Sequence, residues 1–110
     1  MKYTEDNPKL VKYFYDFEGM EYFTGIVKNK DGDIAYFLNG YIHRVDGPAI
    51  KYSNGDIAWY LNNLNHREDG PAIERSNGGK AWWLNGKFYG NDKNFTNESW
   101  IRFVKLELLK

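Results

Sequence analysis

The sequence predicts a single-domain, mainly β protein: an antiparallel meander of tandem 23-residue β-hairpin repeats, followed by a C-terminal amphipathic capping helix. Three observations lead to this prediction. A 23-residue segment occurs twice in succession and begins a third time, Asn-Gly dipeptides interrupt it at fixed positions, and 18% of the residues are aromatic. Aromatic residues favour strands and Asn-Gly favours tight hairpin turns, so the repeated unit is expected to be a hairpin.

The repeat itself is unambiguous in the sequence. Residues 32–54 and 55–77 are identical at 15 of 23 positions without a gap, and a partial third copy covers residues 78–90. A unit of 23 residues is too short for a two-helix repeat of about 34 residues. It has room for two strands of about five residues and two turns. The strands are expected at residues 33–38, 48–52, 56–61, 71–75 and 80–84.

Turn residues separate these strands. Asn54-Gly55 and Asn77-Gly78 predict type I′ turns, which need a positive φ at both central residues. Asn39-Gly40 and Asn85-Gly86 mark the other turn of the unit. The middle copy has Asn62-Asn63 there, and Asn tolerates the left-handed region, so the turn should survive the replacement.

Both ends of the chain depart from the repeat. Residues from about 10 to 31 are expected to form a degenerate N-terminal hairpin, with strands at 13–17 and 20–27 around Glu18-Gly19. Residues 96–110 change to a helical period, with apolar residues spaced i, i+3, i+4 and i+8 from Trp100 to Leu108. This helix is expected to cover the last hairpin near Trp82 and Trp83, closing a sheet edge.

Composition narrows the possible functions. The 110 residues include 15 Lys and Arg and 15 Asp and Glu, so no net charge favours binding to nucleic acid or to an anionic membrane. The absence of cysteine excludes disulfides, cysteine-ligated zinc and thiol nucleophiles. No apolar run is long enough for a spanning helix, and no apolar leader opens the chain. We therefore expect a soluble, cytoplasmic protein.

The repeated unit resembles the MORN repeat. It is similar to the bacterial and viral variant that reads WYLNGKxHREDGPA, through residues 36–40 and 43–49 in one copy and 59–62 and 66–72 in the next. The resemblance implies stacked β-hairpins and a setting in bacteriophages and bacterial islands. The chain lacks the Gly-rich strand and the basic surplus of the eukaryotic form, so the lipid role of that form is not carried over. Residues 89–92 replace the His-Arg-x-Asp pattern, which makes the third copy a cap.

Two loops carry the polar motif of the repeat. His43 and Arg44 precede Asp46, and His66 and Arg67 precede Asp69. Such a set could supply a general base, an anion clamp and an orienting carboxylate, but no nucleophile or third metal ligand accompanies it. We interpret the loops as structural: Asp caps backbone N–H groups, Arg pairs with a carboxylate and His bonds a carbonyl. No catalytic residue, metal or cofactor is expected.

Adjacent aromatic residues recur in the units, at residues 36–37, 59–60 and 82–83. Neighbours on a strand point to opposite faces, so one member of each pair should pack inward and the other could form an exposed stripe.

We therefore predict a non-catalytic protein-binding module. With the viral character of the resemblance, its sharpest form is a small phage-encoded inhibitor of a host protein or nucleoprotein complex, such as a CRISPR-type defence nuclease. The expected contact residues are His43, Arg44, Trp59, Tyr60, His66, Arg67, Glu68, Trp82 and Trp83.

Three alternatives remain open. One is nucleic-acid or nucleotide binding by the aromatic surface with Arg44, Arg67 and Arg75. The others are a hydrolase built on His43 and His66, and a membrane-peripheral scaffold. A monomer and a homodimer both fit the sequence.

Overall fold

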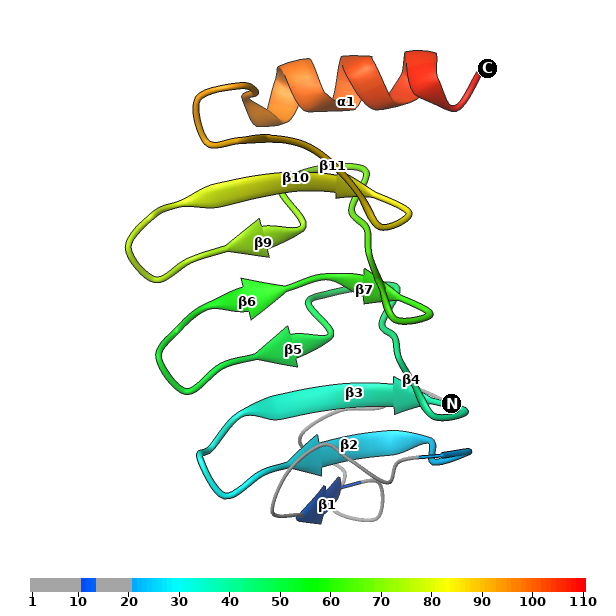
Figure 1. Ribbon diagram of the computed structural model, residues 1–110, viewed down its shortest axis with the longest axis vertical. Helices are drawn as coiled ribbons and strands as arrows, with labels where there is room; N and C mark the ends of the chain where they lie inside the picture. The colour runs from blue at the N-terminus through cyan, green and yellow to red at the C-terminus, as the bar shows by residue number, and fades with distance from the viewer. Residues whose placement is uncertain (1–10, 14–20) are drawn as a thin grey trace.

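The computed structural model describes residues 11–13 and 21–110, as a ladder of short strands with one helix across its end (Figure 1). The strands it contains are β1 (Val11–Tyr13), β2 (Gly25–Lys28), β3 (Ile34–Leu38), β4 (Tyr41–Ile42), β5 (Ile50–Lys51), β6 (Ile57–Ala58), β7 (Tyr60–Leu61), β8 (Leu64–Asn65), β9 (Ile73–Glu74), β10 (Lys80–Leu84) and β11 (Lys87–Asn91). The helix is α1 (Asn97–Glu107).

The main sheet confirms the predicted antiparallel meander. Its strand order is β1-β2-β3-β5-β6-β9-β10-β11, and every pair from β2 onward is antiparallel. β4 pairs with the end of β3, and β7 and β8 form a separate two-stranded sheet. β1 pairs with β2 in parallel, so these two strands are not arms of one hairpin. Of the N-terminal hairpin expected over residues 10–31, the Glu18-Gly19 turn and all but the first residue of the strand at 13–17 lie outside the described residues. The return strand expected at 20–27 is observed as the shorter β2.

The tight turns follow the prediction at one end of the hairpins and differ from it at the other. Both residues have positive φ in Asn39-Gly40, Asn62-Asn63 and Asn85-Gly86, as the prediction required. In Asn54-Gly55 and Asn77-Gly78 only the glycine has positive φ, so the predicted type I′ turns are wrong. Beyond the strand ends, the Tyr52 N–H donates to the Asp56 carbonyl and the Arg75 N–H to the Gly79 carbonyl. Three residues, not two, therefore lie inside each of these hydrogen-bonded loops. A type I turn followed by a left-handed glycine suits that length.

The strands are shorter than the repeat pattern predicted. The expected strands at 48–52 and 71–75 shrink to two residues each, and the one at 56–61 divides into β6 and β7 at Trp59. Pro48 and Pro71 have no N–H to give to a strand ladder, so pairing begins only after them. β4, β8 and β11 follow the tight turns and were not predicted. β4 and β8 have two residues each, which is too few to show alternation, and β11 has five residues, Lys87–Asn91, of which two are aromatic and one is glycine.

Neighbouring aromatic residues point to the two faces of the sheet. We call the face that carries Tyr36, Trp59 and Trp82 the loop face, because the loops and α1 cover these rings. On the opposite face, Phe37 and Tyr60 pack in one apolar cluster. Trp83 contacts Phe88, with ring centroids 5.4 Å apart.

The helix closes the loop face at the end of the ladder. Trp100 and Val104 pack on Trp82 and Leu84 in a buried cluster. Thr96 is the N-cap of the helix and forms a capping box with Ser99. The Thr96 hydroxyl accepts from the Ser99 N–H, and the Ser99 hydroxyl accepts from the Thr96 N–H. The expected contact with Trp82 is confirmed. The expected contact with Trp83 is wrong, because Trp83 lies on the other face of the strand.

Candidate binding cleft between two equivalent loops

Two loops on the loop face hold their arginines in the same way. We call residues 43–48 the first loop and residues 66–71 the second loop. Arg44 Nε donates to Asp46 Oδ1 at 3.1 Å and Arg67 Nε to Asp69 Oδ1 at 2.8 Å. Each guanidinium also donates from Nη1 to a proline carbonyl of its own loop, at 3.3 and 3.2 Å. The predicted pairing of Arg with a carboxylate is therefore present in both loops.

Each guanidinium lies between an aromatic ring and a glycine. Arg67 Cζ lies 4.1 Å from the Trp59 ring centroid, and Arg44 Cζ lies 4.2 Å from that of Tyr36. On the other side, a Cβ on Gly70 would stand 2.7 Å from Arg67 Cζ. A Cβ at this position would be too close to the guanidinium in its observed place, which accounts for the glycine in the Asp-Gly-Pro sequence of the loop.

The histidines tie each loop to the next tight turn. His43 Nδ1 accepts from the Asn62 N–H at 3.1 Å, and His66 Nδ1 accepts from the Asn85 N–H at 2.9 Å. The predicted hydrogen bond from each histidine to a carbonyl is therefore wrong. Each ring accepts from the backbone N–H of a turn residue through Nδ1. His66 Nε2 lies 3.0 Å from Glu68 Oε2, and His66 is only 7% exposed. Val45 occupies the place of Glu68 in the first loop.

Backbone bonds reinforce this coupling and end at the helix. The Arg44 N–H donates to the Tyr60 carbonyl, and the Arg67 N–H donates to the Trp83 carbonyl. The Arg67 carbonyl in turn accepts from Trp100 Nε1 at 2.9 Å. Beyond this point Trp82 is covered by Phe95 and Trp100 and not by an arginine, since glycine stands at position 90.

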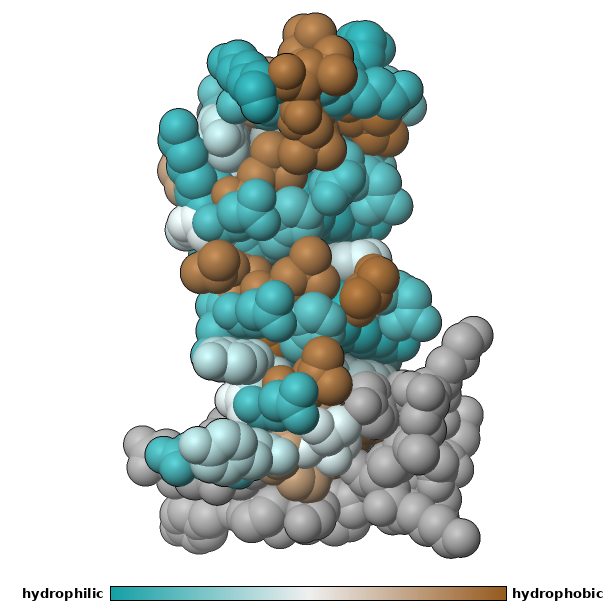
Figure 2. Space-filling view, turned by 90° about the vertical axis from the view of Figure 1, so that its right-hand side faces the viewer, coloured by the Kyte–Doolittle hydropathy of each residue, from teal (hydrophilic) through white to brown (hydrophobic). Residues whose placement is uncertain are grey.

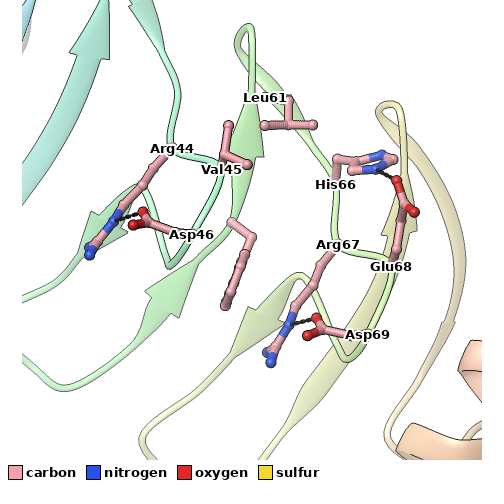
Figure 3. A pocket seen from close by; sticks show the side chains of 9 residues that line it. Arg44, Val45, Asp46, Leu61, His66, Arg67, Glu68 and Asp69 are labelled. Atoms are coloured by element: carbon pink, nitrogen blue, oxygen red, sulfur yellow. Dashed lines mark hydrogen bonds and ion pairs between the residues drawn. The ribbon is translucent and has the colours of Figure 1, made fainter. Parts of the chain in front are cut away.

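A cleft of about 330 Å³ lies between the two loops (Figure 3). Its apolar lining comes from Val45, Trp59 and Leu61, and Val45 is 76% exposed. The polar lining comes from Arg44, Asp46, His66, Arg67, Glu68 and Asp69. Figure 3 shows the two arginines apart from each other, each joined by a dashed line to the aspartate of its own loop.

The structure brings together some of the predicted contact residues and separates others. Arg44, Trp59, His66, Arg67 and Glu68 all line the cleft, and His43 is held in the first loop. Tyr60 and Trp83 lie on the opposite face of the sheet.

The prediction that Trp82 is a contact residue is wrong. It is 0% exposed beneath α1, because the helix takes the place of a third loop on this ring.

Val45 and Leu61 were missed by the sequence reasoning. Their signal was present in the repeat, since Val45 aligns with Glu68 and Leu61 follows the aromatic pair, but only the fold places them beside each other.

Arg75 is separated from the two loop arginines. It lines a hollow of about 270 Å³ on the opposite face, together with Tyr52, Tyr60 and Ile73. Its Nη1 lies 4.0 Å from Asp56 Oδ2. The three arginines expected to bind nucleic acid therefore do not share a surface.

Asp33 and Asp56, two carboxylates with a lowered pKa, connect neighbouring hairpins away from the cleft. Asp33 Oδ1 accepts from the Ser53 N–H, and Asp56 Oδ1 accepts from the Ser76 N–H, each at 2.8 Å. These backbone hydrogen bonds are the main cause that lowers the pKa of both carboxyl groups below the ordinary aspartate value. Both contacts join one hairpin turn to the next, so they serve the fold.

No family model, curated protein or solved structure matches the chain. Among the described residues, no three His, Asp or Glu side chains converge as a metal site would require. In the same part of the chain, α1 is too short and too polar to cross a bilayer.

Proposed function

We propose that the chain is a non-catalytic protein-binding module, built of tandem 23-residue hairpin repeats that resemble the MORN family. The observation that carries the proposal is the cleft between the two loops. Its apolar lining contains the exposed Val45, and charged side chains surround it. An apolar centre within a polar rim is the usual anatomy of a protein interface.

The internal bonds of the loops favour this role over catalysis. Arg67 is occupied by Asp69, by the Pro71 carbonyl and by the Trp59 ring. Both ring nitrogens of His66 also have partners. A general base must have a nitrogen that can take up a proton, and His66 Nδ1 already accepts the Asn85 N–H. These side chains instead stiffen the loops, which lowers the entropic cost of binding a partner.

Other exposed apolar residues extend the candidate surface. Tyr41, Leu64 and Phe88 are exposed in β4, β8 and β11, which follow the tight turns. Figure 2 shows the side of the molecule that carries these turns, where hydrophobic residues reach the surface at several levels between hydrophilic ones. A partner that lies along the ladder would contact several levels at once.

The biological version of the proposal follows from the resemblance alone. A MORN-like unit of the phage variant suits a small cytoplasmic protein that binds and inhibits a host protein, for example a CRISPR-type nuclease. Whatever its identity, the proposed partner is a folded protein whose surface places a side chain in the cleft.

The test is an affinity purification from bacterial lysate with three forms of the full chain. Val45→Asp places a charge in the cleft at a residue that is 76% exposed, so folding should be unaffected. Leu109→Asp makes the same kind of change at an apolar residue that is 83% exposed and lies after the end of α1. Circular dichroism checks that both variants fold.

We expect one stoichiometric protein to be retained by the wild type and by Leu109→Asp, and to be lost with Val45→Asp. Retention by all three forms would move the site away from the cleft. Recovery of nucleic acid in place of a protein, with strong dependence on salt, would replace the proposal by the nucleic-acid alternative.

A further inference from the structure

We propose that His43 and His66 are pH-sensitive latches, which hold each loop to the next tight turn while the imidazole is neutral and release it when the ring is protonated. In both residues Nδ1 accepts a hydrogen bond from a backbone N–H, that of Asn62 or Asn85. A nitrogen that accepts carries no proton. The neutral ring therefore has its proton on Nε2, where His66 donates to Glu68.

Protonation makes both latches incompatible with their turns. The imidazolium carries a proton on each nitrogen, so Nδ1–H would face the N–H of the turn residue. At a separation of 2.9 Å, His66 Nδ1 and Asn85 N cannot both be donors. His66 is 7% exposed, so water has little access to replace the lost bond until the ring moves outward.

The surrounding charges set the balance at each latch. For His66 they are Glu68, Arg67 and Asp69 from its own loop and Arg44 and Asp46 across the cleft. The two arginines are paired with the two aspartates, which leaves Glu68 as the group that favours the imidazolium. Its side chain is 55% exposed, so water screens the attraction.

The first loop has a simpler environment. Val45 stands where the second loop has Glu68, and the next hairpin meets His43 through the Asn62 N–H. The charged groups of its own loop are Arg44 and Asp46, which bond each other. His43 therefore has no carboxylate in its own loop at the position that Glu68 takes beside His66.

The release would loosen the walls of the cleft, since His66 lines it and each loop is tied to the following hairpin. The inference concerns the fold and stands whether or not the cleft binds a protein.

The experiment uses NMR on the full chain. Long-range ¹H–¹⁵N spectra at pH 7.5 should show the Nε2–H tautomer for both histidines. Hydrogen-exchange protection factors, corrected for the intrinsic pH dependence, are then compared at pH 7.5 and 5.5, the range in which an imidazole gains a proton. Protection of the Asn62 and Asn85 amides should fall about tenfold, as expected for loss of one hydrogen bond. The Ala49 amide, which donates to the Ala58 carbonyl, should keep its protection.

A double variant separates the latch from general acid sensitivity. His43→Asn combined with His66→Asn keeps an acceptor oxygen near the place of each Nδ1 but does not titrate, so the fall in protection should disappear. An Nδ1–H tautomer, unchanged protection at pH 5.5, or an equal fall in the double variant would each overturn the proposal. The first two results come from the wild type and do not depend on a variant folding.

Discussion

The tight packing of Arg67 against Gly70 gives the sharpest prediction about stability. In Gly70→Ala the new Cβ would lie 2.7 Å from Arg67 Cζ and 2.9 Å from its Nε. The Trp59 ring, 4.1 Å from Arg67 Cζ on the other side, prevents the guanidinium from moving straight away from Gly70 while it stays stacked. The arginine must therefore leave its place. The backbone of Gly70 does not have the positive φ that would itself disfavour alanine, so the clash can be measured without backbone strain.

The cost can be worked from the contacts that are lost. The hydrogen bond from Arg67 to the Pro71 carbonyl contributes about 1 kcal/mol. The stacking on Trp59 contributes about 0.5–1 kcal/mol. The ion pairs with Asp69 and Glu74 together add at most about 0.5 kcal/mol, because both carboxylates are exposed to solvent. Alanine returns about 0.4–1 kcal/mol by restricting the unfolded chain. The net loss expected for Gly70→Ala is about 1–2 kcal/mol.

The assay is a double-mutant cycle measured by urea unfolding. Without the Arg67 side chain there is nothing for the new Cβ to strike, so Gly70→Ala made in an Arg67→Ala background should be neutral or slightly stabilising. The coupling free energy between the two positions should be about 2 kcal/mol. Gly78→Ala serves as a control, since its cost comes from a φ of +93° with no neighbouring atom. A Gly70→Ala cost that persists in full without Arg67 would refute the reasoning.

Three further predictions concern other parts of the fold. Trp100→Ala should lower the free energy of unfolding by about 3–5 kcal/mol, because this fully buried ring fills the core beneath α1; thermal and urea unfolding measure it. Asn63→Gly should lower the free energy of unfolding by about 0.5–1 kcal/mol although its φ of 68° suits glycine, since its side chain accepts the backbone N–H of Ile42 in β4. Asn62→Gly is the control, because Asn62 also has a positive φ but bonds His43 through its backbone N–H and not through its side chain. Asp56→Asn should reduce acid sensitivity: the lowered pKa of Asp56 means that its carboxylate stabilises the fold above the ordinary value of 3.8 and loses this effect as the pH falls below it, so unfolding between pH 4 and 2 should be shallower in the variant.

The mainly β meander and the C-terminal helix could be predicted because short stretches of sequence determine the turns and the helix. Asn62-Asn63 has the left-handed backbone expected of its neighbours in the repeat, and the apolar period from Trp100 onward gives the helix. The type of the Asn54-Gly55 turn could not be read from the dipeptide. It depends on the number of residues between the paired strands, which only the register of β5 and β6 fixes.

The candidate site was predicted less completely. The motif in the loops pointed to Arg67 and His66, but their partners lie in other units of the chain, with Trp59 before the loop and Asn85 after it. Trp82 has the same place in its copy as Trp59, yet it is buried, because the helix covers it where the sequence no longer supplies an arginine. Contacts between units depend on how the hairpins stack, and a single unit of sequence does not contain that information.

The measurement that tests the central claim most directly is site-specific photo-crosslinking from the cleft. A photoreactive amino acid is placed at position 45, inside the cleft, or at position 109, which is also exposed, and the chain is irradiated in bacterial lysate. The account predicts one discrete protein adduct from position 45 that is absent from position 109. Identical adducts from both positions, or no protein adduct from position 45, would contradict it.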